Sequence, residues 1–384
     1  MFLDRGANVN AEIPWSGRIS LHYAIEYEKM KIAELLLNHG ANLNKKSDVT
    51  PLHLAVKKGH EQFVKMLLER GANVNAKSWD GTTMLHDAME NKEIQITELL
   101  LNHGANVNAR NNNGVTPLYF AIQRGHVGGV TMLLDRGANV NHQNQWSSTT
   151  LLHDAMENKE IEIAELLLNH GANINASDKS GVTPLCLAVR KRHVSGVQML
   201  LDKGANVNAE TRNGTTPLNY AIENKEVDIA ELLLNYGANV NASDTYGVTP
   251  MCLAVQKGHV RGVKMLLDRG ANVNLEILDG ISPLHYAIKH EKMEIFELLL
   301  NHGANVNALS DTYGVTALCL AVRKRHVSGV KMLLDRGANV NPEILDGTTP
   351  LHDAIGNTEI AQLLLNHGAN VNASDKSGIT LNCS

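Results

Sequence analysis

The tripeptide Gly-Ala-Asn recurs along the chain at intervals of 31 to 34 residues. It begins at Gly6, Gly40, Gly71, Gly104, Gly137, Gly171, Gly204, Gly237, Gly270, Gly303, Gly337 and Gly368. Self-similarity at this period is typical of repeat proteins, in which each short unit packs on its neighbours. A chain of 384 residues would ordinarily be divided into two or three globular domains. The period predicts instead that residues 1–384 form a single array of repeated units.

A second signature precedes most of these glycines by about twenty residues, as in TPLHLA from Thr50, TPLYFA from Thr116 and TPLCLA from Thr183. The hydroxyl can cap a helix while the proline occupies its first turn, where no N–H is needed. Apolar residues then follow at i, i+3 and i+4, and a second amphipathic stretch ends at the glycine, which favours a left-handed C-terminal residue. Each unit is therefore predicted to be a pair of short helices that cannot bury their apolar faces alone.

The stretch GVTPLCLAVRKRHVSGVQMLLDKGANVNA, from Gly181 to Ala209, closely resembles the ankyrin repeat, whose signature is T-P-L-H-x-A at a period of 33. About eleven such units cover residues 11–376, between a partial N-terminal unit at 1–10 and a partial C-terminal unit at 377–384. The resemblance implies an all-α solenoid of antiparallel helix pairs, with loops that project as β-hairpin-like fingers. The departures are local: the first unit, ISLHYA from Ile19, lacks the proline, and the last full unit is two residues short at Gly356.

The units also alternate, which gives a longer period of about 66 residues. At the end of the first helix, basic pairs alternate with the glutamates Glu90, Glu157 and Glu223. Duplication of a two-unit block explains this alternation, and rows about 8 to 10 Å apart would then compensate each other's charge in solvent. The other interpretation is a charge pattern that contacts a partner. Its candidate residues are Lys57, Lys58, Arg124, Arg190, Lys191, Lys257, Arg323 and Lys324.

In ankyrin arrays the finger tips and the exposed side of the first helix commonly form a concave binding surface. Aromatic residues make up only 4% of this chain, yet several fall at expected finger tips: Trp79, Trp146, Tyr246 and Tyr313. Exposed Trp and Tyr are typical anchors of protein interfaces. We therefore expect these four residues to contact a partner protein, the alternative being that they pack on a neighbouring finger.

The 18 histidines follow the repeat rather than a metal site. Five precede the capping glycine and six occupy the fourth place of the Thr-Pro-Leu-His signature, so equivalents lie about one helix spacing apart, too far to share a zinc ion. Structural hydrogen bonding is predicted for them. The His-Asp pairs at His86, His153 and His352 are interpreted in the same way, as repeated coincidence.

The four cysteines, Cys186, Cys252, Cys319 and Cys383, lie 66, 67 and 64 residues apart, in alternate units. Two helix spacings exceed the roughly 7 Å between Cα atoms that a disulfide allows, so free thiols are predicted. No phosphate-binding loop, dinucleotide fingerprint or metalloprotease helix occurs. We therefore expect no catalytic residue, no cofactor, no metal and no small-molecule substrate.

Charge and hydropathy limit the partners. The 35 basic and 40 acidic residues give a net charge of −5 and are mixed along the chain, which argues against nucleic acid. No run approaches the roughly 20 apolar residues of a membrane span, and the first residues, MFLDRGANVN, do not resemble a secretory signal. We expect no membrane partner and an intracellular location, cytoplasmic or nuclear, or the host cytosol for an effector.

Together with these patterns, the resemblance to ankyrin repeats implies a non-enzymatic scaffold that binds one or more proteins along its concave face and loop tips. Two alternatives stay open. The chain ends supply no recognisable capping repeat, so the units could stack end to end in a self-assembling structural element. The array could also be the targeting portion of a larger effector, toxin, channel or enzyme.

Overall fold

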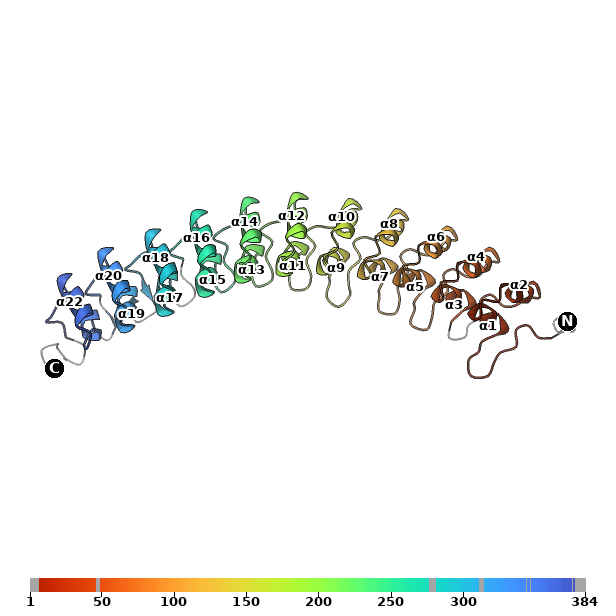
Figure 1. Cartoon of the computed structure of the whole chain (residues 1–384), viewed down its shortest axis with the longest axis horizontal. Helices are drawn as coiled ribbons and strands as arrows, with labels where there is room; N and C mark the ends of the chain where they lie inside the picture. The colour runs from red at the N-terminus through yellow and green to blue at the C-terminus, as the bar shows by residue number, and fades with distance from the viewer. Residues whose placement is uncertain are drawn as a thin grey trace. The chain divides into compact units, whose positions relative to one another are not determined.

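The computed structural model describes residues 7–45, 49–275, 281–310, 314–342, 344–345, 347–374 and 376. These residues hold 22 helices and two short strands, drawn in Figure 1. The helices group into two compact units, Met1–Lys179 and Ser180–Ser384. The expected partial units at 1–10 and 377–384 fall largely or wholly outside the described residues, as does Cys383.

The first unit is a double row of helices. Each odd-numbered helix packs against the even-numbered helix that follows it, and successive odd-numbered helices within this unit pack against each other, so the odd helices form one row (Figure 1). Its helices are α1 (Ser20–Glu26), α2 (Met30–Asn38), α3 (Pro51–Lys57), α4 (Glu61–Glu69), α5 (Met84–Asn91), α6 (Ile94–Asn102), α7 (Pro117–Gln123), α8 (Val127–Asp135), α9 (Leu151–Glu157) and α10 (Ile161–Asn169).

The second unit repeats this arrangement. A short antiparallel strand pair joins α18 to α19, with Leu309 opposite Thr316. The elements are α11 (Pro184–Arg190), α12 (Val194–Asp202), α13 (Pro217–Glu223), α14 (Val227–Asn235), α15 (Pro250–Gln256), α16 (Val260–Asp268), α17 (Pro283–Lys289), α18 (Met293–Asn301), β1 (Leu309–Ser310), β2 (Val315–Thr316), α19 (Ala317–Arg323), α20 (Val327–Asp335), α21 (Pro350–Asp353) and α22 (Thr358–Asn366).

The helix boundaries follow the expected capping chemistry. The side chain of Thr183 accepts a hydrogen bond from the backbone N–H of Cys186, and Pro184 takes the first helical position of α11. At the other end, Gly104 follows α6 with a φ of 83°, a conformation that only glycine adopts without strain. The Nδ1–H of His103 donates to the carbonyl of Leu99 at 2.8 Å, which satisfies one of the free carbonyls at the helix end.

The core is a thin layer between the two rows. In α7 and α8 the side chains of Leu118, Ala121, Val130 and Leu133 are almost completely buried. The alanine lets neighbouring helices approach closely. Because each layer is completed by the next helix pair, no pair could bury this surface alone, as the sequence predicts.

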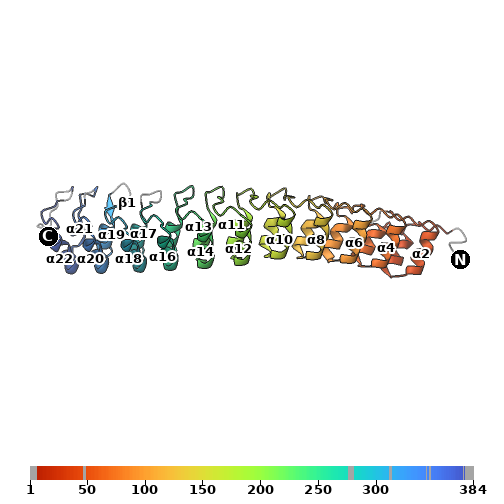
Figure 2. The same ribbon diagram turned by 90° about the horizontal axis from the view of Figure 1, so that it is seen from above.

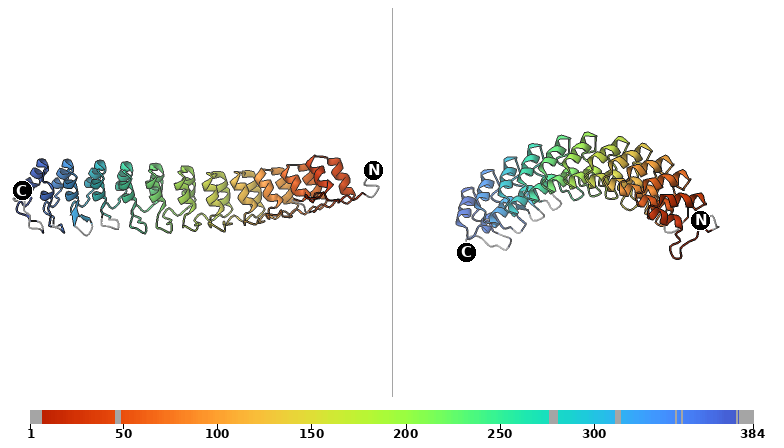
Figure 3. Two further views of the ribbon diagram at one scale, coloured as in Figure 1. Left: turned by 90° about the horizontal axis from the view of Figure 1, so that it is seen from below. Right: turned by 45° about the vertical axis from the view of Figure 1, so that its right-hand side comes forward.

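The loops that follow the even-numbered helices project to one side within each unit (Figures 2 and 3). Antiparallel bridges close two of them, between Lys77 and Thr83 and between Gln143 and Thr150. The β1–β2 pair closes a third. The expected β-hairpin-like fingers are therefore present.

Asparagine side chains link the turns at the finger bases from one repeat to the next. The Nδ2 of Asn108 donates to the carbonyl of Gly137 at 3.1 Å, and its Oδ1 accepts from the backbone N–H of Asn139 at 2.7 Å. The same pair of bonds recurs at Asn75, Asn141, Asn208, Asn307 and Asn341. This ladder explains why the repeat keeps asparagine at the second Asn of Asn-Val-Asn.

Candidate partner-binding surface

The finger tips hold their aromatic side chains out into solvent. Trp79 is 87% exposed, Trp146 79% and Tyr246 60%. The interpretation that they pack on a neighbouring finger therefore does not describe these three side chains. The fourth expected tip residue, Tyr313, lies outside the described residues.

A short polar side chain fixes the backbone beside each of these aromatics. Asp80, next to Trp79, accepts hydrogen bonds from the Ser78 hydroxyl at 2.5 Å and from the backbone N–H of Thr82 at 3.1 Å. The bond from Ser78 is the main reason that the pKa of Asp80 is lowered to about 2. Asp244 accepts from the N–H groups of Tyr246 and Val248, both at 2.9 Å. These turns present the aromatic rings with little freedom of the backbone to lose on binding.

Asn144 serves the same purpose for Trp146. Its Oδ1 accepts from the backbone N–H of Trp146 at 2.8 Å. An aspartate or asparagine two residues before the aromatic is thus shared by Trp146 and Tyr246, and it is readable in the sequence as Asn-x-Trp and Asp-x-Tyr.

Several of the candidate basic residues form ion pairs with a neighbouring first helix or its end. Arg124 meets Glu90 at 2.7 Å, Lys257 meets Glu223 at 3.4 Å and Arg323 meets Asp353 at 2.8 Å. Lys58 lies 4.0 Å from Glu26, and Lys324 lies 3.9 Å from Glu291. The compensating-charge interpretation is therefore correct for these side chains. Exposed pairs of this kind contribute only about 0 to 1 kcal/mol each.

The other candidate basic residues differ in their surroundings. The guanidinium carbon of Arg190 lies 5.6 Å from the centre of the Tyr220 ring, within cation–π range. Lys57 is exposed at the end of α3, and its charge acts on Asp87 of α5. Lys191 is the exposed C-cap residue of α11.

Two carboxylates on the first helices have unusual surroundings that were not predicted from the sequence, because the His-Asp pairs were interpreted as coincidence. Asp87 of α5 is 8% exposed, and burial raises its pKa to about 6. Asp154 of α9 occupies the same place in its repeat, and burial raises its pKa to about 7. With the capping Thr as the first place, both stand at the fifth. The sequence signal was the recurrence of a charged residue at a place that other units fill with Leu, Tyr or Phe.

Histidines at the fourth place of α3 and α5 link their repeats to the next one. The Nδ1 atoms of His53 and His86 lie 3.0 and 2.8 Å from the hydroxyls of the capping Thr50 and Thr83. Their Nε2–H groups donate to a backbone carbonyl of the next repeat, at 3.4 and 3.0 Å. Burial lowers the pKa of His53 to about 4. The predicted structural role is confirmed, and no metal-binding cluster of three ligands occurs in the part of the chain that the structure describes.

The three described cysteines, Cys186, Cys252 and Cys319, are free thiols, as predicted. Burial raises the pKa of Cys186 and of Cys319. Both therefore stay protonated and are poor nucleophiles.

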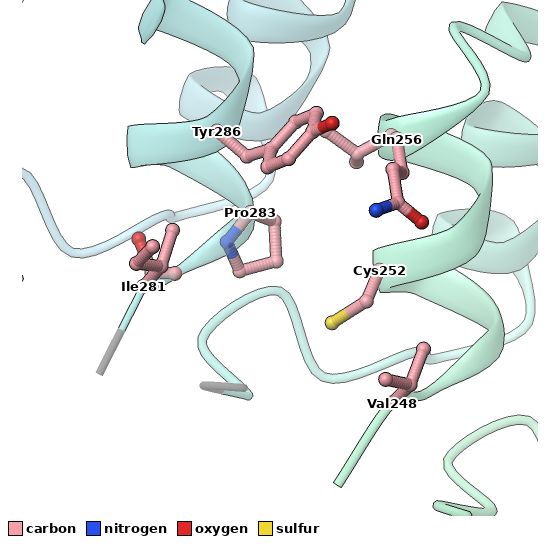
Figure 4. Close-up of a pocket in the computed structure, with 8 residues that line it drawn as sticks. Val248, Cys252, Gln256, Ile281, Pro283 and Tyr286 are labelled. Carbon is pink, nitrogen blue, oxygen red and sulfur yellow. The ribbon is translucent and has the colours of Figure 1, made fainter. Parts of the chain in front are cut away.

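A small cavity of about 40 Å³ lies between α15 and α17. Figure 4 shows Tyr286 of α17 beside Gln256 of α15, with Pro283 and Ile281 of the α17 side below and Cys252 of α15 facing them. Pockets that hold small-molecule ligands are typically about 300 to 1,000 Å³, so this cavity has room only for water. It does show how a fifth-place side chain, that of Tyr286, lies beside the eighth-place side chain of the preceding first helix, that of Gln256.

The sequence profile described as "Ankyrin repeats (3 copies)" matches residues 1–78, 75–144, 137–211, 206–277 and 271–344, and "Ankyrin repeat" matches 346–376. The chain belongs to the ankyrin repeat family. The ankyrin fold is a helical repeat solenoid and a general, typically non-catalytic, protein-interaction module. None of the helices in the described ranges has the length and apolar character that a membrane span requires.

Two solved ankyrin structures are similar to this one. The ankyrin repeat domain of Bcl-3, a member of the IkappaB family, is 30% identical with a TM-score of 0.53, over 58% of this chain and 99% of that one. The human ASB11 ankyrin repeat domain is 30% identical with a TM-score of 0.50, over the same shares. A search of curated protein sequences finds no match.

Proposed function

We propose that this ankyrin protein is a non-enzymatic scaffold that binds partner proteins through its finger tips and the exposed face of its first helices. The observation that carries the proposal is the exposure of Trp79 and Trp146 on fingers whose backbones are fixed by hydrogen bonds. Large aromatic side chains that remain in solvent and have little backbone freedom to lose are well suited to be interface hot spots.

The extent of the array is part of the same proposal. We infer about eleven repeats in residues 11–376 of a single array over residues 1–384. The support is that the 22 helices of the described residues alternate in sequence between seven- or eight-residue first helices and nine-residue second helices, apart from the shortened α21.

Removing both tryptophans should weaken partner binding without unfolding the protein. We expect Trp79→Ala and Trp146→Ala together to lower affinity at least 30-fold, since a hot-spot residue is worth about 2 kcal/mol or more. Partners would be captured from the native cell with the wild-type chain, identified by mass spectrometry, and their affinities measured with purified proteins. Circular dichroism would check that helicity is unchanged.

Ile32→Ala with Leu35→Ala is the matched control, because both residues are exposed apolar side chains on the second helix α2. This control should change the affinity less than twofold. If the tryptophan variant captures the same partners with wild-type affinity, the finger tips are not the binding site.

A further inference from the structure

Asp87 is a buried carboxylate without a hydrogen-bond donor. The residue is 8% exposed, and its Oδ2 has no partner among the described residues. Buried polar atoms in native proteins are nearly always paired, so each exception requires an explanation. The positive charge of Lys57 on α3 acts on Asp87, but the two side chains form no ion pair. Oδ2 of Asp87 is therefore an acceptor that no donor among the described residues satisfies.

The same place in other repeats shows which group fits there. Asp353, at the fifth place of α21, accepts a hydrogen bond at 2.8 Å from Nε of Arg323, at the eighth place of α19. Tyr220, at the fifth place of α13, has the guanidinium of Arg190 over its ring from the eighth place of α11. In both cases an arginine of the preceding first helix lies against the fifth-place side chain.

In the first unit neither fifth-place carboxylate forms such a contact with a cation of the preceding first helix. The eighth place before Asp154 holds Gln123, which carries no charge, and the eighth place before Asp87 holds the unpaired Lys57. Asp154 forms no ion pair with the described residues either, and the nearest charge on its own helix is the repulsive one of Glu157. Neither carboxylate thus forms an ion pair like the one between Asp353 and Arg323.

An aromatic surface separates the two carboxylates. Phe120, at the fifth place of α7, is half-buried and lies edge-on to His86 with ring centres 5.8 Å apart. Tyr119, on the same helix, lies 6.1 Å from Phe120 and senses the charge of Asp154. The face of α5, α7 and α9 therefore holds a largely buried carboxylate, a half-buried aromatic ring and a second, partly exposed carboxylate in a row.

We propose that this face binds an extended, basic segment of a partner protein, with one cationic side chain at Asp87, an apolar side chain on Phe120 and a second cationic side chain at Asp154. First helices pack roughly 8 to 10 Å apart, so the two carboxylates lie roughly 16 to 20 Å apart. An extended chain advances about 3.3 Å per residue, which places the two basic residues five to six positions apart. The proposal rests on the scaffold function above and specifies the chemistry of its partner.

The direct test uses a fluorescein-labelled peptide, Arg-Ser-Ser-Leu-Ser-Ser-Arg, and the full chain at pH 8 and low salt. Fluorescence anisotropy should show saturable binding to the wild type. Asp87→Asn with Asp154→Asn should weaken it at least tenfold, and Phe120→Ala about threefold. Replacing both arginines of the peptide by glutamate, or placing them side by side, should have the same effect as the double variant.

Glu98→Gln with Glu165→Gln is the matched control, because it makes the same change in net charge on the exposed faces of α6 and α10. It should alter the affinity less than twofold. Equal weakening by the control would mean general charge attraction and would overturn the proposal, as would a peptide that does not bind or an unaffected Asp87/Asp154 variant. The scaffold function would survive any of these results if the Trp79/Trp146 variant still loses its captured partners.

Discussion

Asparagine in place of Asp87 and Asp154 should make the protein more stable at pH 8 and leave its stability unchanged at pH 4. Burial raises the pKa of the two carboxyls from 3.8 to about 6 and about 7. Between pH 4 and 7 the folded chain therefore keeps protons that the unfolded chain has released, and stability falls as pH rises through this window. At about 1.4 kcal/mol per pKa unit the cost is at most about 3 kcal/mol for Asp87 and 4 kcal/mol for Asp154.

We expect about 2 kcal/mol of stabilisation per site, because asparagine removes the buried charge but leaves an amide with unmet hydrogen-bonding groups. Urea unfolding at pH 4 and pH 8 measures the difference between variant and wild type. Parts of a repeat array can unfold separately, so amide exchange in α5 and α9 would localise the effect. A double variant that is less stable than the wild type at pH 8 would contradict the prediction that these two ionised carboxylates destabilise the fold.

Asp353→Asn is the natural control for this experiment. Asp353 occupies the same place in its repeat but is bonded to Arg323 at 2.8 Å. Its replacement should lower stability at pH 8 or leave it within about 1 kcal/mol, the range of partly exposed ion pairs. If asparagine stabilises the protein at positions 87 and 154 but destabilises it at position 353, the ion pair with Arg323 explains the difference. The place in the repeat alone would then not determine how a carboxylate affects stability.

The helices could be predicted from local sequence because their signals are local. Thr183 and Pro184 define the start of α11, and Gly104 defines the end of α6, each within one turn of the residues that it affects. The pairing of Arg124 with Glu90 also followed from the sequence, because alternation of charge places opposite signs one repeat apart. These features depend only on the period of the repeat.

The asparagine ladder and the buried carboxylates could not be predicted in the same way. Asn108 bonds to Gly137 and Asn139, about one repeat away, and its side chain looks like an ordinary turn residue in the local sequence. The burial of Asp87 depends on how closely α3 and α7 flank α5, which no single repeat specifies. The exposure of Trp79 followed from its position at a finger tip and is seen in the structure. Its contact with a partner protein remains a prediction.

His86→Ala should be among the most destabilising single changes, with a loss of about 3 to 5 kcal/mol. His86 is buried, and its Nδ1 accepts hydrogen bonds from the hydroxyl of Thr83 at 2.8 Å and from its backbone N–H at 3.2 Å. Its Nε2–H donates to the carbonyl of Val115 in the next repeat at 3.0 Å. Alanine would leave these groups without partners and open a cavity beside Phe120.

His86→Asn separates the two functions of this side chain. Asn219 occupies the same place in α13, where its Oδ1 accepts from the hydroxyl and the N–H of Thr216. Asparagine at 86 should therefore keep the cap on α5 but be too short to reach Val115. We expect a loss of about 1 to 2 kcal/mol, the value of one buried hydrogen bond.

The inter-repeat bond also couples the unfolding of neighbours, so its loss should change the shape of the transition as well as its midpoint. In urea at pH 8, His86→Asn should broaden the unfolding curve, since α5 and α7 would then separate more easily. Burial lowers the pKa of His86, so the wild type should lose stability as pH falls below about 6.5, the pKa of an unfolded histidine. The asparagine variant should lose less of its stability over that range. If the alanine and asparagine variants lose the same free energy of unfolding at pH 8, the cap formed with Thr83 contributes no stability. The whole effect of His86 would then come from its hydrogen bond to Val115.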